Sequence, residues 1–150
     1  MTDDALPGRP ELVEPELVEE VNAIPDPILT AMVQVINQSD ANKIGLTLQV
    51  CGSTITGTAI SASAFFDQMA QWVAERGARD FGESFAKPMA ATLREEQAAP
   101  EDEQSIPRFI HLRDAAVYAP GAAQSIPQPL WRGRLSHVSG WSIGSLSYAS

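Results

Sequence analysis

Apolar residues spaced three and four positions apart predict a first helix over residues 28–37. Asp26 is suited to cap its N-terminus and Pro27 to open its first turn, because an aspartate accepts free backbone N–H groups and proline lacks one. The polar run at 37–40 predicts the end of the helix. The expected apolar face consists of Ile28, Leu29, Met32, Val35 and Ile36.

Alternating apolar and polar residues over 44–50 predict a half-buried strand. A turn at 51–53 and a second run at 54–61 complete a predicted β-hairpin. Gly57 lies within the second strand, where a glycine would permit a sharp bend or a bulge.

Two helices are predicted after this hairpin. Ser63 is suited to cap a helix over 64–75, and Gly77 is suited to end it. The second helix is expected over 78–96, with a kink at Pro88. Four-residue spacing along this helix is typical of a packing face rather than of a cofactor site, and the residues concerned are Phe81, Phe85, Met89 and Leu93.

The remaining third of the chain has the composition of strands and loops. Residues 97–107 predict an exposed acidic loop, and 108–114 predict a short strand. The segment near 119–129 is rich in proline and has no periodicity, so we expect a mobile loop there. The clearest strand pattern is at 130–135 and 141–146, which predicts a second β-hairpin.

These elements predict an α+β fold. Two hairpins and one short strand favour a small antiparallel β-barrel or curved sheet of SH3-like or Sm-like form, with an N-terminal helix and an inserted helical pair. A flatter antiparallel sheet covered by helices is the alternative. The chain has 150 residues, which is typical of one domain, and we place that domain at 27–150.

Charge divides the chain into unequal parts. Of the formal charge of −9, residues 1–26 carry −7, from eight acids against one arginine. Four prolines and mutual repulsion predict a disordered acidic tail, whose near-repeat at 11–20 (ELVEP, ELVEE) is a candidate docking motif. Five acids and no base lie at 95–103, whereas residues 104–150 carry +3. The acidic balance disfavours nucleic acid as a general partner.

The residues that enzymes need are not arranged in a recognisable motif. No glycine-rich phosphate loop occurs, and no serine stands in a nucleophile-elbow sequence. One cysteine, Cys51, and two histidines are too few for a disulfide framework or a structural zinc site. No apolar run is long enough to span a bilayer, and the acidic N-terminus is unlike a secretion signal. We therefore expect a cytoplasmic protein without a catalytic site, a cofactor, a metal or a membrane partner.

Two segments of the C-terminal half carry candidate binding residues. Alternation places His111 on the strand face opposite Ile110 and Leu112, in a structural role or in contact with a partner. Tryptophan and arginine are enriched in interface hot spots, and such side chains on a small barrel could also stack single-stranded RNA. Alternatively the tryptophans fill the core and the arginines are solvated. The residues concerned are Trp131, Arg132, Arg134 and Trp141.

Three separated blocks of the sequence resemble the GvpU family of gas vesicle accessory proteins. They are the hairpin at 46–61 followed by a Phe-Phe helix, the segment at 109–115 (FIHLRDA), and the pair at 130–135 (LWRGRL) and 140–144 (GWSIG). The similarity covers about residues 28–147 and leaves out the acidic tail and the proline-rich loop.

The resemblance implies a non-enzymatic cytoplasmic protein that clusters gas vesicles. Clustering requires binding to the vesicle shell or another gas vesicle protein, and also to itself. The family likeness identifies no binding residues, so Trp131, Arg132, Arg134, His111 and Trp141 are candidates by residue type alone. An Sm-like RNA-binding module is the alternative function, and a small hydrolase using a serine and one of the two histidines is a third hypothesis.

Overall fold

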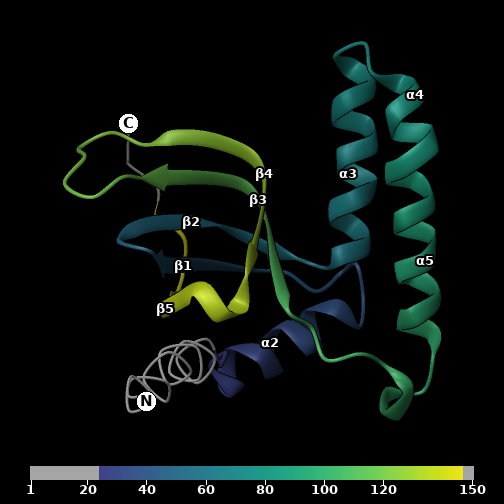
Figure 1. The fold of residues 1–150 in the computed structure, drawn as a ribbon, viewed down its shortest axis with the longest axis horizontal. Helices are drawn as coiled ribbons and strands as arrows, with labels where there is room; N and C mark the ends of the chain where they lie inside the picture. The colour runs from purple at the N-terminus through teal and green to yellow at the C-terminus, as the bar shows by residue number, and fades with distance from the viewer. Residues whose placement is uncertain (1–23, 147–150) are drawn as a thin grey trace, which may run out of the picture.

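The computed structural model describes residues 24–146 of the 150-residue chain. Most of the predicted disordered tail, at 1–23, lies outside the described residues, as do residues 147–150. The described part has a five-stranded antiparallel sheet, with one helix packed against the sheet and a helical pair standing beside it (Figure 1). The α+β class predicted from the sequence is confirmed.

The predicted strands are present with bounds that differ by a few residues, whereas the single helix predicted at 78–96 is divided into two helices by a π-helical turn. The strands are β1 (Ile44–Val50), β2 (Ser53–Ile60), β3 (Phe109–Tyr118), β4 (Ile126–Arg134) and β5 (Val138–Ile143). The helices are α2 (Pro27–Asn37), α3 (Ala62–Glu75), α4 (Arg79–Phe81) and α5 (Lys87–Ala98). A π-helical turn joins α4 to α5 at Gly82–Ala86, and 3-10 turns lie at Glu101–Glu103 and Leu135–His137.

Helix α2 begins where the sequence predicts. Pro27 occupies its first turn, and Asp26 Oδ1 accepts a hydrogen bond from Ile28 N at 2.8 Å. Ile28 and Val35, which were expected on the buried face, are 64% and 54% exposed, so that expectation was wrong. Seven-residue spacing places them together on the stripe next to the buried one. The buried stripe consists of Leu29, Val33 and Ile36.

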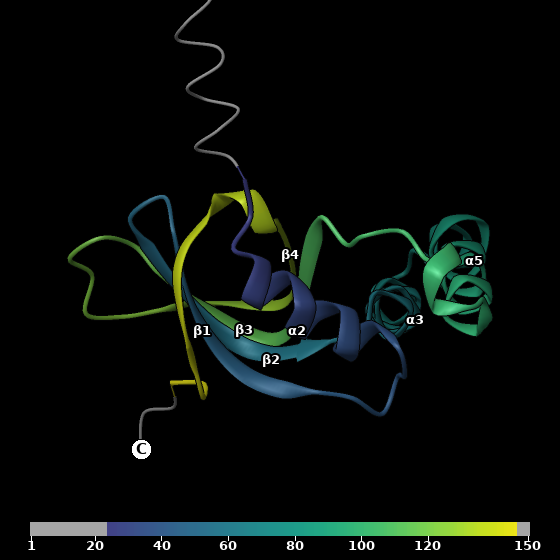
Figure 2. The same cartoon turned by 90° about the horizontal axis from the view of Figure 1, so that it is seen from below.

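The strands are ordered β4-β3-β2-β1-β5, and all neighbours are antiparallel. The predicted hairpin between the last two strands is wrong. β4 pairs with β3, with Trp131 opposite Leu112, whereas β5 pairs with β1, with Trp141 opposite Leu48. The short turn at Leu135–His137 therefore carries the chain from one edge strand to the other, which curves the sheet without closing it (Figure 2). An SH3-like or Sm-like form stays a prediction.

Strand β4 begins at Ile126, inside the segment near 119–129 that was expected to be a loop. Proline is tolerated here because β4 is an edge strand, whose outward positions need no N–H donor. Residues 126–129 are therefore strand rather than loop. The expected acidic loop at 97–107 is also shorter, because α5 continues to Ala98.

The sheet separates two sets of apolar side chains. The inner core lies between α2 and the concave face of the sheet (Figure 2). The outer cluster joins the opposite face to the helical pair. The inner core consists of Leu29, Val33, Ile36, Leu46, Leu48, Ile55, Ala59, Ile110, Leu112, Ala115 and Leu135. The outer cluster consists of Ile60, Phe65, Phe66 and Ala90, with Met69, Met89, Leu93 and Leu130 packed against it.

A polar network around Asp40 fixes the helical pair to the rest of the domain. Asp40 Oδ1 accepts hydrogen bonds from the hydroxyl groups of Ser61 and Ser63, where α3 begins. Its Oδ2 accepts from Arg94 of α5, at 3.0 Å from Nε and 2.7 Å from Nη2. Partial burial raises the pKa of Asp40, but these hydrogen bonds outweigh burial and hold the pKa well below its ordinary value. The ionised carboxylate therefore sets where the helices lie relative to the sheet.

The helical pair leaves aromatic side chains exposed. A π-helical turn immediately precedes α5, and Pro88 lies in the first turn of α5. A Cβ on Gly82 would lie 3.0 Å from the carbonyl oxygen of Ala70, so glycine permits the close approach to α3. Phe81 and Phe85, which were expected to pack, are 51% and 42% exposed, so that expectation was wrong. An aromatic surface is thus presented next to the sheet.

Candidate functional site

A groove of about 380 Å³ opens between the helical pair and the sheet. Its walls are formed by the C-terminal end of α2, the start of α3, the π-helical turn, α5, the segment at 101–108, and strands β3 and β4. Much of the lining is apolar, and two of the apolar side chains, Phe85 and Ile106, are 42% and 70% exposed. Concave apolar surface of this kind is typical of binding sites. The apolar lining of this Phe109 groove includes Phe66, Phe85, Met89, Leu93, Ile106 and Phe109.

Strand pairing brings two arginines onto the ring of Phe109. Arg134 lies directly opposite Phe109 in the β3–β4 ladder, and Arg132 lies opposite His111. All four side chains point to the same face of the sheet, because alternate residues of a strand share a face. The Arg132 guanidinium carbon lies 3.6 Å from the Phe109 ring centre, and that of Arg134 lies 5.4 Å from it. Both distances are within the range of cation–π attraction.

Three arginines at this site have no carboxylate partner among the described residues. They are Arg108, which lines the groove, together with Arg132 and Arg134. Burial, and then the charge of Arg134, lower the pKa of Arg132. We call these three residues the arginine cluster. Unpaired positive charge beside an apolar groove favours a ligand that has both apolar and anionic groups.

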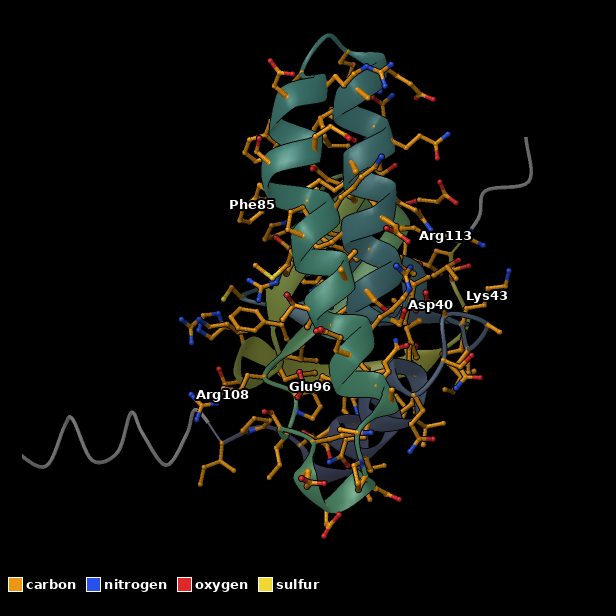
Figure 3. The ribbon with its side chains drawn as sticks, turned by 90° about the vertical axis from the view of Figure 1, so that its right-hand side faces the viewer. Asp40, Lys43, Phe85, Glu96, Arg108 and Arg113 are labelled. Atoms are coloured by element: carbon orange, nitrogen blue, oxygen red, sulfur yellow. The ribbon has the colours of Figure 1, made fainter. Side chains whose placement is uncertain are left out.

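The opposite wall of the groove is acidic. Glu96 and Glu101 line it, and Glu96 Oε1 accepts a hydrogen bond from the backbone N–H of Ser105 at 2.9 Å. Figure 3 shows Phe85 and Arg108 along one side of the helical pair, with Glu96 near its lower end. The groove is therefore electrically asymmetric, with positive charge on the strand side and negative charge on the helix side.

His111 forms the buried base of the arginine cluster. Its side chain is 4% exposed, and the centre of its ring lies 4.7 Å from the centre of the Phe65 ring. Its Nε2 accepts a hydrogen bond from Arg132 Nε at 3.1 Å. Burial, and then the charge of Arg132, lower the pKa of His111 to about 3. An arginine can only donate, so the proton of the neutral imidazole is on Nδ1. That atom has no hydrogen-bond partner within residues 24–146.

The five candidate residues from the sequence lie on two different faces of the sheet. His111, Arg132 and Arg134 come together at Phe109, whereas the two tryptophans lie on the other face. Trp131 packs against the inner core with its ring over Gly133, where a Cβ would approach the ring within 2.2 Å. Trp141 also packs there, and its Nε1 donates to Asp26 Oδ2 at 2.9 Å.

Sequence reasoning missed the aromatic half of the site. Phe109 lies within the strand predicted at 108–114 and was not a candidate residue, although its two-residue spacing from His111 places both side chains on one face. Phe85 was assigned to packing because of its four-residue spacing. Which helical face meets the sheet depends on contacts such as Asp40 with Arg94, which are 54 residues apart.

The described residues include no serine that is hydrogen-bonded to His111 or His137, and no group of three potential metal ligands. Cys51 is an exposed free thiol at the β1–β2 turn. None of the helices that the structure describes has the length and apolar character to cross a membrane.

The comparisons with known proteins identify a family. A family model described as gas vesicle protein GvpU-like matches residues 26–146, which is most of the chain. No curated protein and no solved structure matches the chain. The matched residues include the Phe109 groove and all five strands, and they leave the acidic segment at 11–20 outside the family match.

Proposed function

The chain belongs to the GvpU-like family of gas vesicle proteins, and we propose that it is a non-enzymatic accessory protein that binds gas vesicles and clusters them. Clustering needs two kinds of contact, one with the vesicle and one with a second copy of the chain. The Phe109 groove supports the first. The open edges of the sheet support the second.

The arginine cluster beside exposed aromatic rings carries the proposal for vesicle binding. A chain with a formal charge of −9 nevertheless keeps Arg108, Arg132 and Arg134 free of carboxylates among its described residues. Arginine and aromatic side chains are enriched where proteins bind one another. The partner that fits is the vesicle shell or another gas vesicle protein, with an apolar segment that carries carboxylates.

The sheet edges support self-association. β4 and β5 each pair with one strand only, so one side of each offers backbone groups to another chain. Ile126 of β4 and Ile143 of β5 are 60% and 58% exposed. A second copy that adds to either edge would cover an apolar side chain and pair free backbone groups. A cytoplasmic location follows from the proposed partner.

The acidic side of the groove argues against RNA binding, which was the alternative function from the sequence. Phosphates bound to the arginine cluster would face Glu96 and Glu101 on the other side of the groove. The segment at 95–103 holds five acids and no base. Repulsion from this side opposes a phosphate backbone.

Flotation with purified gas vesicles tests the proposal. Bound protein rises with the vesicles, so we expect the wild-type chain to be enriched in the buoyant layer. Replacing Arg108 and Arg134 together by alanine is expected to weaken vesicle binding about tenfold, or ~1.4 kcal/mol, because the anionic groups of the partner lose their contacts.

A charge-matched control separates a local effect from a general one. Arg76 and Arg79 lie where α3 meets α4, at the far end of the helical pair (Figure 1). Replacing both by alanine removes the same charge and is expected to leave flotation unchanged. Absence of the wild-type chain from the buoyant layer would refute vesicle binding, and equal loss in both double variants would refute the groove as its site.

A further inference from the structure

We propose that the acidic segment at residues 11–20 docks in the Phe109 groove of its own molecule and competes there with the gas vesicle partner. The competition rests on the function proposed above, whereas the docking does not. The groove then has an internal ligand that limits how much of it is free.

Charge complementarity supports this occupant. Residues 11–20 (ELVEPELVEE) contain five glutamates and no base. The arginine cluster offers three guanidinium groups that no described carboxylate neutralises. Arg132 uses its Nε–H on His111 and keeps its terminal nitrogens for a ligand. Guanidinium groups bind carboxylates through paired, charge-assisted hydrogen bonds.

The apolar residues of the segment also match the groove. Leu12 and Val13 recur five positions later as Leu17 and Val18, and glutamates flank both pairs. Phe85 and Met89 of the helical wall can cover such side chains. The acidic wall sets the orientation, because the glutamates of the segment are repelled by Glu96 and Glu101 and are drawn to the strand side.

The length of the connection allows docking within one molecule. The C-terminal end of α2 lines the groove, and this helix of 11 residues is about 16 Å long. Twelve Cα–Cα steps separate Leu12 from Ile24 and can span about 40 Å when extended. The first Leu-Val pair can therefore reach past residues 24–26, which span at most about 10 Å, and past the whole length of α2. A connection this short gives an effective concentration in the millimolar range, which favours docking in the same molecule over docking in another.

Peptide competition tests the docking with the full chain and without vesicles. The probe is a fluorescent peptide of sequence ELVEPELVEE, and its binding is measured by fluorescence anisotropy. The variant replaces Leu12, Val13, Leu17 and Val18 by serine in the full chain, which keeps every charge. We expect this variant to bind the peptide at least about tenfold more tightly than the wild-type chain, because its own segment no longer fills the groove.

Two further measurements fix the site. Adding Arg108→Ala and Arg134→Ala to the serine variant is expected to abolish peptide binding, whereas adding Arg76→Ala and Arg79→Ala is expected to leave it unchanged. Equal peptide affinity of the wild-type chain and the serine variant would overturn the proposal, as would a serine variant that does not bind. If the serine variant binds the peptide more tightly than the wild-type chain but the wild-type chain does not float with vesicles, the docking is supported and the vesicle function is refuted.

Discussion

Replacing Trp131 by alanine is expected to lower the free energy of unfolding by about 3 kcal/mol. Its indole packs against the inner core and covers Gly133, and it lies opposite Leu112 in the β3–β4 ladder. Truncation removes these apolar contacts and leaves a cavity at the edge of the inner core. Chemical denaturation followed by circular dichroism measures the loss.

Arg134 on the same strand is the matched control. Its side chain points to the opposite face of the sheet and is exposed. Arg134→Ala is expected to change the free energy of unfolding by less than about 0.5 kcal/mol. If Trp131→Ala left stability unchanged but abolished flotation, Trp131 would be an interface residue instead of a core residue.

Acidification is expected to destabilise the fold through His111, by about 2 kcal/mol between about pH 7.5 and about pH 5. The pKa of His111 is lowered to about 3 in the folded protein, by burial and then by the charge of Arg132, from an ordinary value of 6.5. Below pH 6.5 the unfolded chain takes up a proton that the folded chain does not. The contribution of the neutral His111 to the free energy of unfolding is therefore fully present well above pH 6.5, and it is lost as the pH drops toward 3.

The pH effect can be assigned by substitution. His111→Gln removes the titrating group, so the free energy of unfolding of this variant is expected to vary less between about pH 7.5 and about pH 5 than that of the wild-type chain. Asp26, Asp40 and Glu83 have a lowered pKa, and their contribution is lost only at more acidic pH. A wild-type chain whose stability is flat over this range would contradict a buried neutral imidazole.

Local features of the fold could be predicted from the sequence because neighbouring residues determine them. The cap of α2 at Asp26 needs only the next residues of the chain. The β1–β2 turn is equally local, with positive φ angles at Cys51 and Gly52. The partners of β4 and β5 could not be predicted, because Leu112 with Trp131 and Leu48 with Trp141 are long-range pairs that both satisfy the same alternation.

The candidate site could likewise be predicted only where it depends on neighbouring residues of the chain. Strand alternation predicts that the side chains of Arg132 and Arg134 lie on the same face of the sheet, and the structure places both beside the ring of Phe109. The exposure of Phe85 was not predictable, because a four-residue spacing describes a stripe and not what covers the stripe. The position of the helical pair depends on long-range contacts such as the hydrogen bonds of Asp40 with Ser61 and Arg94, which a local sequence pattern does not show.

Site-specific photo-cross-linking on intact gas vesicles tests the central claim most directly. A photoreactive phenylalanine derivative is introduced separately at Phe85 in the groove and at Ile143 on the β5 edge, which are 42% and 58% exposed. We predict that the probe at 85 links to a gas vesicle protein and that the probe at 143 links to a second copy of the chain. Links to a gas vesicle protein from position 143 and none from position 85 would contradict the account.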